Sequence, residues 1–341
     1  MNETPILNDL GSTPKAGKSW TYRWCDYVEL RCLVHPDGRF ARDNLAEALR
    51  EVADIPATDG TEYGDDAGLG SPDDAPVDDS PVAVDDREEA FSARCFRQLR
   101  WRSTVFGEDW PFEIDRADCE VRLRPGDRSA RHWLYLQLLL SASLGYCPPR
   151  RRVDLTGPFE TISFNVLQRL MPAGAEVHPF GTRQSGRYIG HLYDRLQALA
   201  LDLRGRLDLQ REHFAPRDHG DGGLDLVAWH GLGDERDRII VALAQCGCTA
   251  EDWPMKMQEA SPDRLSGHLN IPASWTTYYF MPLDLADEIN GRMDWQRKSD
   301  MGTAIVIDRL RFLRLADADT LLAQGLLTTG LVQEAVTLRV A

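Results

Sequence analysis

Apolar residues recur at regular spacing in the N-terminal third of the chain. Residues 42–52 predict a short amphipathic helix and residues 87–101 a longer one. The apolar stripe of the longer helix consists of Phe91, Cys95, Phe96 and Leu99. Residues 21–34 suit either a helix or a strand, and residues 112–123 predict one or two short strands. This part of the chain is therefore expected to be an α+β domain.

The longest uncharged apolar run lies at residues 133–147. It is shorter than the roughly 20 residues that a membrane span needs, and it contains polar side chains, so it predicts a buried core helix. The sequence CPPRRR at residues 147–152 then breaks the chain. We place the domain boundary there, so that residues 1–152 form the α+β domain and residues 153–341 a second domain.

The second domain is expected to begin with a helix at residues 156–170. Thr156 is a plausible N-cap for this helix, and Pro158 suits its first turn. A short strand at residues 175–181 and a second amphipathic helix at residues 186–203 follow. Helices and strands therefore alternate from the start of this domain.

Two apolar strands come next. Residues 224–229 leave a glycine-rich turn and carry one acid, Asp225, and residues 238–246 form a buried strand with Gln245 near its end. Residues 249–260 restart as a helix, for which Asp252 is a good N-cap.

The remaining apolar stretches complete the second domain. Residues 273–285 predict a strand, and residues 303–315 a strand or a helix. The tail at residues 321–340 is apolar at helical spacing and is expected to form a helical extension.

The net charge of −15 is concentrated in one segment. Residues 51–90 hold fourteen Asp or Glu against one Arg, so the rest of the chain is nearly neutral. Within this segment, residues 54–86 are rich in Asp, Pro and Gly and predict a disordered acidic linker. Residues 91–152 carry an excess of Arg. This distribution is compatible with a nucleic-acid partner.

The cysteines and the N-terminal residues indicate the cellular compartment in which the protein is expected. The seven cysteines are scattered and form no CxxC pair, which is typical of free thiols in a reducing cytoplasm. The first 18 residues contain no apolar run of the kind found in a secretory signal. We expect a cytoplasmic protein without a membrane segment.

Some of the polar residues suit phosphodiester hydrolysis. Mg²⁺ is a hard cation that prefers oxygen ligands, and it both polarises a phosphoryl group and lowers the pKa of a bound water. A lysine nearby stabilises the developing negative charge. An apolar strand with a lone Asp, beside a strand that ends in a polar acceptor and leads to a helix with a lysine, offers these groups.

The motifs GDGGLDLVAW, AQC and DWPMK, with the preceding PFE helix, resemble PD-(D/E)XK restriction-like proteins, in particular a bacterial group that commonly serves phage defence. The resemblance implies an α/β domain with a mixed central sheet flanked by helices, and a Mg²⁺ site in which Mn²⁺ can substitute. It implies that Glu160, Asp225 and Gln245 bind the metal, with Gln245 in the position of the second acid. Lys256 completes the implied catalytic set.

Two positions depart from the family pattern. The lysine of the (D/E)xK tripeptide would stand at 247, where this chain has Gly247, and a lysine on the next helix, Lys256, is placed to replace it. Gln245 is neutral and binds Mg²⁺ more weakly than a carboxylate does. Because only 4 of the 39 basic residues are Lys, the Lys at this position stands out.

The sequence thus predicts a Mg²⁺-dependent DNA endonuclease of a bacterial antiphage defence or restriction system, acting with other defence proteins. A second hypothesis is a catalytically degenerate fold that serves as a nucleic-acid-binding or scaffold subunit. Simpler interpretations remain for single residues: Asp225 as the cap of a turn, Glu160 as a first-turn acid that favours the helix dipole, and Lys256 as a surface lysine.

Overall fold

The computed structural model describes residues 7, 20–50, 81–181, 186–218 and 220–337. They form two compact units: the N-terminal unit comprises the described residues up to Gly126 together with Val336 and Thr337, and the C-terminal unit runs from Asp127 to Ala335. The division precedes the boundary expected at 147–152. The reason is that the apolar helix α4 (Ala130–Ser141) packs against helices of the C-terminal unit and so belongs to it.

The N-terminal unit combines helices with a small sheet. Its elements are α1 (Thr21–Val34), β1 (Arg39–Ala41), α2 (Arg42–Arg50), α3 (Pro81–Phe106), β2 (Phe112–Ile114) and β3 (Glu120–Leu123). The three strands form an antiparallel sheet in the order β1-β3-β2. The two expected helices are confirmed, residues 112–123 hold two short strands, and the undecided segment at 21–34 is a helix.

Helix α3 is longer than the sequence pattern indicated. It begins at Pro81, inside the range 54–86 that was expected to be linker, and proline suits the first turn of a helix. Residues 54–80 of that range lie outside the described residues. The four residues of the expected apolar stripe, Phe91, Cys95, Phe96 and Leu99, are all buried.

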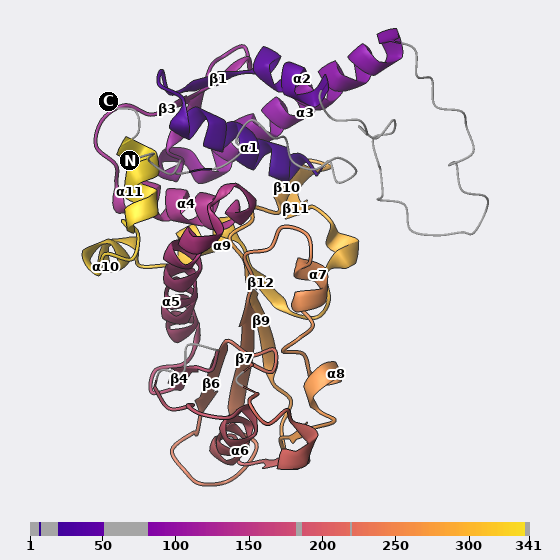
Figure 1. The fold of residues 1–341 in the computed structure, drawn as a ribbon, viewed down its shortest axis with the longest axis vertical. Coiled ribbons are helices and arrows are strands. Elements are labelled where there is room, and N and C mark those ends of the chain that lie inside the picture. Colours follow the sequence, from indigo (N-terminus) through magenta and orange to yellow (C-terminus); the bar gives the residue numbers. More distant parts are fainter. Residues whose placement is uncertain (1–6, 8–19, 51–80, 182–185, 219, 338–341) are drawn as a thin grey trace, which may run out of the picture. The chain divides into compact units, whose positions relative to one another are not determined.

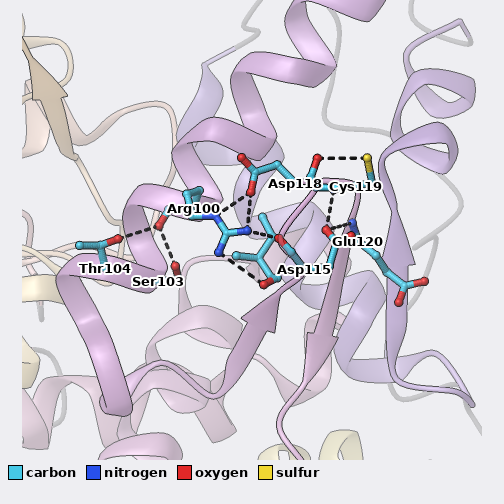
Figure 2. Close-up of polar contacts among 9 residues, drawn as sticks. Arg100, Ser103, Thr104, Asp115, Asp118, Cys119 and Glu120 are labelled. Atoms are coloured by element: carbon cyan, nitrogen blue, oxygen red, sulfur yellow. Dashed lines mark hydrogen bonds and ion pairs between the residues drawn. The ribbon is translucent and has the colours of Figure 1, made fainter.

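The turn between β2 and β3 is fixed by side chains (Figure 2). Arg100 of α3 donates to the Asp118 carboxylate at 2.6 Å and to the carbonyl of Asp115. The Asp115 carboxylate accepts the N–H groups of Cys119 at 2.7 Å and Glu120 at 3.0 Å. Asp118 has a φ of 54°, a left-handed conformation that Asp tolerates better than most residues. Helix α3 thus sets the turn that pairs the two strands.

A buried ion cluster lies between α1 and α3. The guanidinium of Arg102, fully buried, lies 2.9 Å from the carboxylates of both Asp26 and Glu29. Glu29 also accepts the indole N–H of Trp110 at 3.1 Å. Because Arg102 of α3 pairs with two buried acids of α1, the packing of the two helices depends on Arg102.

From Asp127 onward the chain alternates helices and strands. The helices are α4, α5 (Val153–Leu170), α6 (Leu192–Asp202), α7 (Trp253–Lys256), α8 (Pro262–Leu265), α9 (Arg309–Leu315), α10 (Ala318–Ala323) and α11 (Gly330–Thr337). The strands are β4 (Glu176–Pro179), β5 (Arg206–Leu207), β6 (Leu226–His230), β7 (Ile240–Cys246), β8 (Leu269–Asn270), β9 (Thr276–Phe280), β10 (Ala286–Ile289), β11 (Arg292–Trp295) and β12 (Ile305–Ile307).

Five of these strands form one mixed sheet in the order β12-β9-β7-β6-β4 (Figure 1). Strands β4, β6 and β7 are antiparallel neighbours. A crossover that contains α7 and α8 then leads to β9, which is parallel to β7, and β12 is parallel to β9. The undecided segment at 303–315 is therefore both a strand and a helix, since β12 is followed by α9.

Helices cover both faces of this sheet. On one face, Val227, Val241 and Leu243 pack in the same core cluster as residues of α6. On the other face, the Phe312 ring of α9 lies 5.5 Å from the Phe159 ring of α5 and 5.8 Å from the Phe280 ring of β9. We call these the α6 face and the α5 face.

Helix α5 begins three residues earlier than expected. Its first residue is Val153, and the N–H of Thr156 already donates to the carbonyl of Arg152 at 2.9 Å, so Thr156 is not the N-cap. The early start buries Leu155. Pro158 consequently lies inside the helix. Asp252 does stand at the N-cap of α7, although its side chain forms no capping bond there.

The apolar run that raised the question of a membrane segment forms a core helix, as expected. Residues 134–141 of α4 are all buried. Within the ranges that the structure describes, no helix is long and apolar enough to cross a membrane.

The ion cluster gives a first prediction. We expect Arg102→Met to lower the free energy of unfolding by about 3–5 kcal/mol, because it removes the buried cation that lies 2.9 Å from both Asp26 and Glu29. Arg122→Met, which removes a surface ion pair with Glu120, should change it little. Urea unfolding followed by circular dichroism measures both variants. Equal stability of the two variants would contradict the prediction.

Candidate active site

Asp225 stands where three strands of the mixed sheet end. It directly precedes β6, and its N–H donates to the carbonyl of Ala244 in β7 at 2.9 Å. Its own carbonyl accepts the N–H groups of Phe180 at 2.6 Å and Gly181 at 3.1 Å, which follow β4. Since the register pairs Ala244 with Leu226, two successive residues face Ala244, as in a β-bulge.

The side chain of Asp225 is fixed by the same strand ends. Its Oδ2 accepts the N–H of Cys246, the last residue of β7, at 2.8 Å. On the other side, a Cβ at position 181 would lie 2.9 Å from Oδ1, so the carboxylate approaches Gly181 closely. Glycine at 181 is therefore required by the position of this carboxylate.

The environment makes Asp225 hard to ionise. Its pKa is raised to about 7, first of all by burial and in addition by the negative charges of Asp221 and Glu160. The Cys246 N–H and the positive charge of Lys256 act in the opposite direction. Burial combined with like charges is typical of functional carboxylates.

Three of the four expected site residues act on one another here. Glu160 on α5 and Lys256 at the end of α7 lie near enough to Asp225 for their charges to change its pKa. Asp221 joins them, although the sequence analysis did not select it. A signal was present, because Asp221 stands in the glycine-rich turn four residues before Asp225. The carboxylate cluster therefore consists of Glu160, Asp221 and Asp225.

Gln245, the fourth expected residue, is oriented differently. Cys246 hydrogen-bonds with Ser163 of α5 and so lies on the α5 face. Successive side chains of a strand point to opposite faces, which places Gln245 on the α6 face, beside its register partner Tyr279. Gln245 is 5% exposed, and its Oε1 has no hydrogen-bond partner among the described residues. The structure does not bring its amide to the side of Glu160.

Gly247 is explained by Tyr279. A side chain at 247 would overlap the Tyr279 hydroxyl, and its Cβ would lie 2.8 Å from the ring carbon that carries this hydroxyl. Burial raises the pKa of Tyr279, so the phenol stays protonated. Like Gln245 Oε1, the hydroxyl is buried without a partner in the described part of the chain. A lysine cannot stand at 247 beside this tyrosine.

Two cysteines border the carboxylate cluster. Burial raises the pKa of Cys246 and of Cys248, and the charges of Glu160 and Asp225 raise both further. Both thiols therefore stay protonated and add no charge to the site.

The donor set suits a hard divalent cation in part. Glu160, Asp221 and Asp225 supply carboxylate oxygens, and a cation would offset the burial and the like charges that raise the pKa of Asp225. Over the residues that the structure describes, no three His, Cys, Asp or Glu side chains are arranged so that they could hold a metal ion. Mg²⁺ usually keeps several waters and needs only one or two carboxylates, so the residues present are compatible with it.

Comparison of the chain with models of protein families, with curated proteins and with solved structures finds no match.

The raised pKa of Asp225 makes stability depend on pH. The folded protein holds this proton up to about pH 7, whereas an unfolded Asp releases it near pH 4, so the free energy of unfolding falls as the pH rises between these values. Without metal, Asp225→Asn should therefore be more stable than the wild type by about 1–3 kcal/mol above pH 7, and the difference should vanish near pH 4.

Urea unfolding of both proteins from pH 4 to pH 8 measures this difference. The pKa of Asp308 is also raised to about 7, chiefly by burial. Asp308 titrates in both proteins, so its contribution to the pH dependence cancels in the difference. A difference that does not change with pH would contradict the expectation.

The contact between Gly247 and Tyr279 gives another test. We expect Gly247→Ala to destabilise the protein by about 1–3 kcal/mol, the usual cost of forcing extra volume into a packed core. Tyr279→Phe removes the overlapping hydroxyl, so the double variant should lose less than the two single variants together. Strict additivity in urea unfolding would show that the two positions do not touch.

Proposed function

We propose that the C-terminal unit is a metal-dependent nuclease of the PD-(D/E)XK type that cleaves DNA as an endonuclease. One observation carries the proposal: a buried carboxylate, Asp225, stands at the end of the mixed sheet with two further carboxylates and a lysine acting on its charge. The resemblance of the sequence motifs to that family supports the same function.

The residues of this chain divide the chemistry between them. Asp225, with Glu160 or Asp221, would provide the one or two carboxylate ligands that a Mg²⁺ or Mn²⁺ ion needs, and Asp225 would be deprotonated in the metal-bound state. When bound, the ion polarises the phosphoryl group and lowers the pKa of a coordinated water. Lys256 places a compact positive charge where the phosphate gains negative charge during attack.

A second candidate function is a nucleic-acid-binding or scaffold subunit without cleavage activity. Two observations favour it. Gln245 replaces a charged ligand and points to the α6 face. In addition, the described residues offer no ready set of three metal-binding side chains. The two functions differ in whether the cluster binds a cation productively.

The resemblance also suggests the biological setting. The protein would act in the cytoplasm of a bacterium, in antiphage defence or restriction, together with other proteins of the same system. DNA is the expected nucleic acid, and the nearly neutral charge outside residues 51–90 is compatible with it.

Substitution of the lysine tests the proposed enzyme. Lys256→Ala should reduce cleavage of plasmid and single-stranded DNA about 100-fold or more, the usual scale for loss of one charge-stabilising donor, without loss of folding. Lys256→Arg should restore little, because a planar guanidinium does not replace an ammonium. The assay follows nicking in Mg²⁺ and in Mn²⁺.

Two variants serve as controls in this assay. Lys298→Ala removes an exposed lysine that pairs with Asp294 at 2.9 Å, and it should cleave like the wild type. Asp225→Asn should be inactive at every metal concentration. Cleavage by Lys256→Ala at the wild-type rate would remove Lys256 from the site, and DNA binding without any cleavage by the wild type would favour the scaffold subunit.

A further inference from the structure

Arg195 is a buried cation next to the carboxylate cluster. It belongs to α6, it is 1% exposed, and its guanidinium lies over the ring of Phe180 at 4.5 Å. One terminal nitrogen donates to the carbonyl of Gly220 at 2.7 Å, and the other to the carbonyl of Gly181 at 3.1 Å. The planar fork of arginine therefore joins two separate segments of backbone.

Both of these segments border Asp225. Gly181 donates its N–H to the Asp225 carbonyl and lies against the Asp225 carboxylate. Gly220 opens the turn that carries Asp221 and continues directly into Asp225. Arg195 thus links the segment on one side of Asp225 to the turn on the other.

The charge of Arg195 is directed at the same place. Burial lowers its pKa, while the negative charges of Asp221 and Asp218 raise it. Its two hydrogen bonds go to neutral carbonyls, so the positive charge stays available to the surrounding acids. A buried cation acts over a longer range than an exposed one, because water screens it less.

We propose that Arg195 is a positioning residue of this site: it clamps the Gly181 segment to the Gly220 turn and so holds the carboxylates of Asp225 and Asp221 in their working arrangement. The inference rests on the proposed function, since a working arrangement implies a reaction. It assigns to α6 a role in the site that none of its sequence motifs indicates.

Two substitutions distinguish the two hydrogen bonds of the Arg195 guanidinium from its positive charge. Arg195→Lys keeps the charge but cannot reach both carbonyls as a planar fork, and Arg195→Met loses both. We expect kcat for a defined duplex in Mn²⁺ to fall about 10-fold in the first and about 100-fold in the second, because small misplacements of reacting groups cost this much. KM should stay within about twofold of the wild type, since Arg195 is too deeply buried to bind DNA.

Arg211→Lys is the matched control. Arg211 pairs with Asp194, which lies on α6 like Arg195. Because Arg211 is exposed and lies outside the carboxylate cluster, the kcat of Arg211→Lys should match that of the wild type. Urea unfolding of each variant shows whether it is folded, and if Arg195→Met does not fold, Arg195→Lys decides. Wild-type kcat in Arg195→Lys, or a change confined to KM, would overturn the proposal.

A measurement without metal and without DNA keeps this inference separate from the nuclease proposal. Amide hydrogen exchange of Phe180, Gly181 and Cys246, whose N–H groups bond to Asp225, is followed by NMR in wild type and in Arg195→Met. Loss of the clamp should speed the exchange of these amides about tenfold or more, because the segments on both sides of Asp225 open more often. Absence of DNA cleavage by the wild type would sink the nuclease proposal, whereas unchanged exchange of these amides would overturn the role of Arg195, whether or not the wild type cleaves DNA.

Discussion

The site depends on a single irregularity of backbone pairing. At the end of the mixed sheet, Asp225 uses its N–H for Ala244, its carbonyl for Phe180 and Gly181, and its carboxylate for Cys246. Every one of these bonds crosses from one strand end to another. Because two successive residues face Ala244, the side chain of Asp225 leaves the regular alternation and turns toward the N–H of Cys246. Its position is therefore fixed by the sheet itself.

The bonds of Asp225 do not by themselves require an ionisable side chain. The bond to Cys246 could be made by a neutral side chain, and a buried carboxylate beside the charges of Glu160 and Asp221 destabilises the fold at neutral pH. Such a cost is typical of sites where charge serves a reaction. The simpler interpretations do not describe these two acids: the Asp225 carboxylate bonds to Cys246 of β7, and Glu160 is not in the first turn of α5, which begins at Val153.

Most elements could be predicted because their patterns are local. The stripe of α3, the strand β7 and the core helix α4 each follow from apolar spacing within one segment. The start of α5 could not, since it depends on the burial of Leu155. In the site, Asp225, Glu160 and Lys256 were selected from the motifs, and Asp221 stands in the same glycine-rich motif, whereas the contribution of Arg195 appears only in the folded contacts. The side of the sheet to which Gln245 points could not be predicted, because it depends on which residues of β7 face α5 in the folded protein.

Tyr279 bears on where the cations of this region stand. Its hydroxyl occupies the space beside Gly247, the residue after β7, so a side chain at this position would require Tyr279 to move. The cation that acts on the charge of Asp225 belongs to a helix instead, since Lys256 stands at the end of α7. A second helix contributes Arg195, which bonds to the Gly220 turn and acts on Asp221. The Asp225 carboxylate is thus held by strand ends, whereas the cations beside the carboxylate cluster belong to helices outside the sheet.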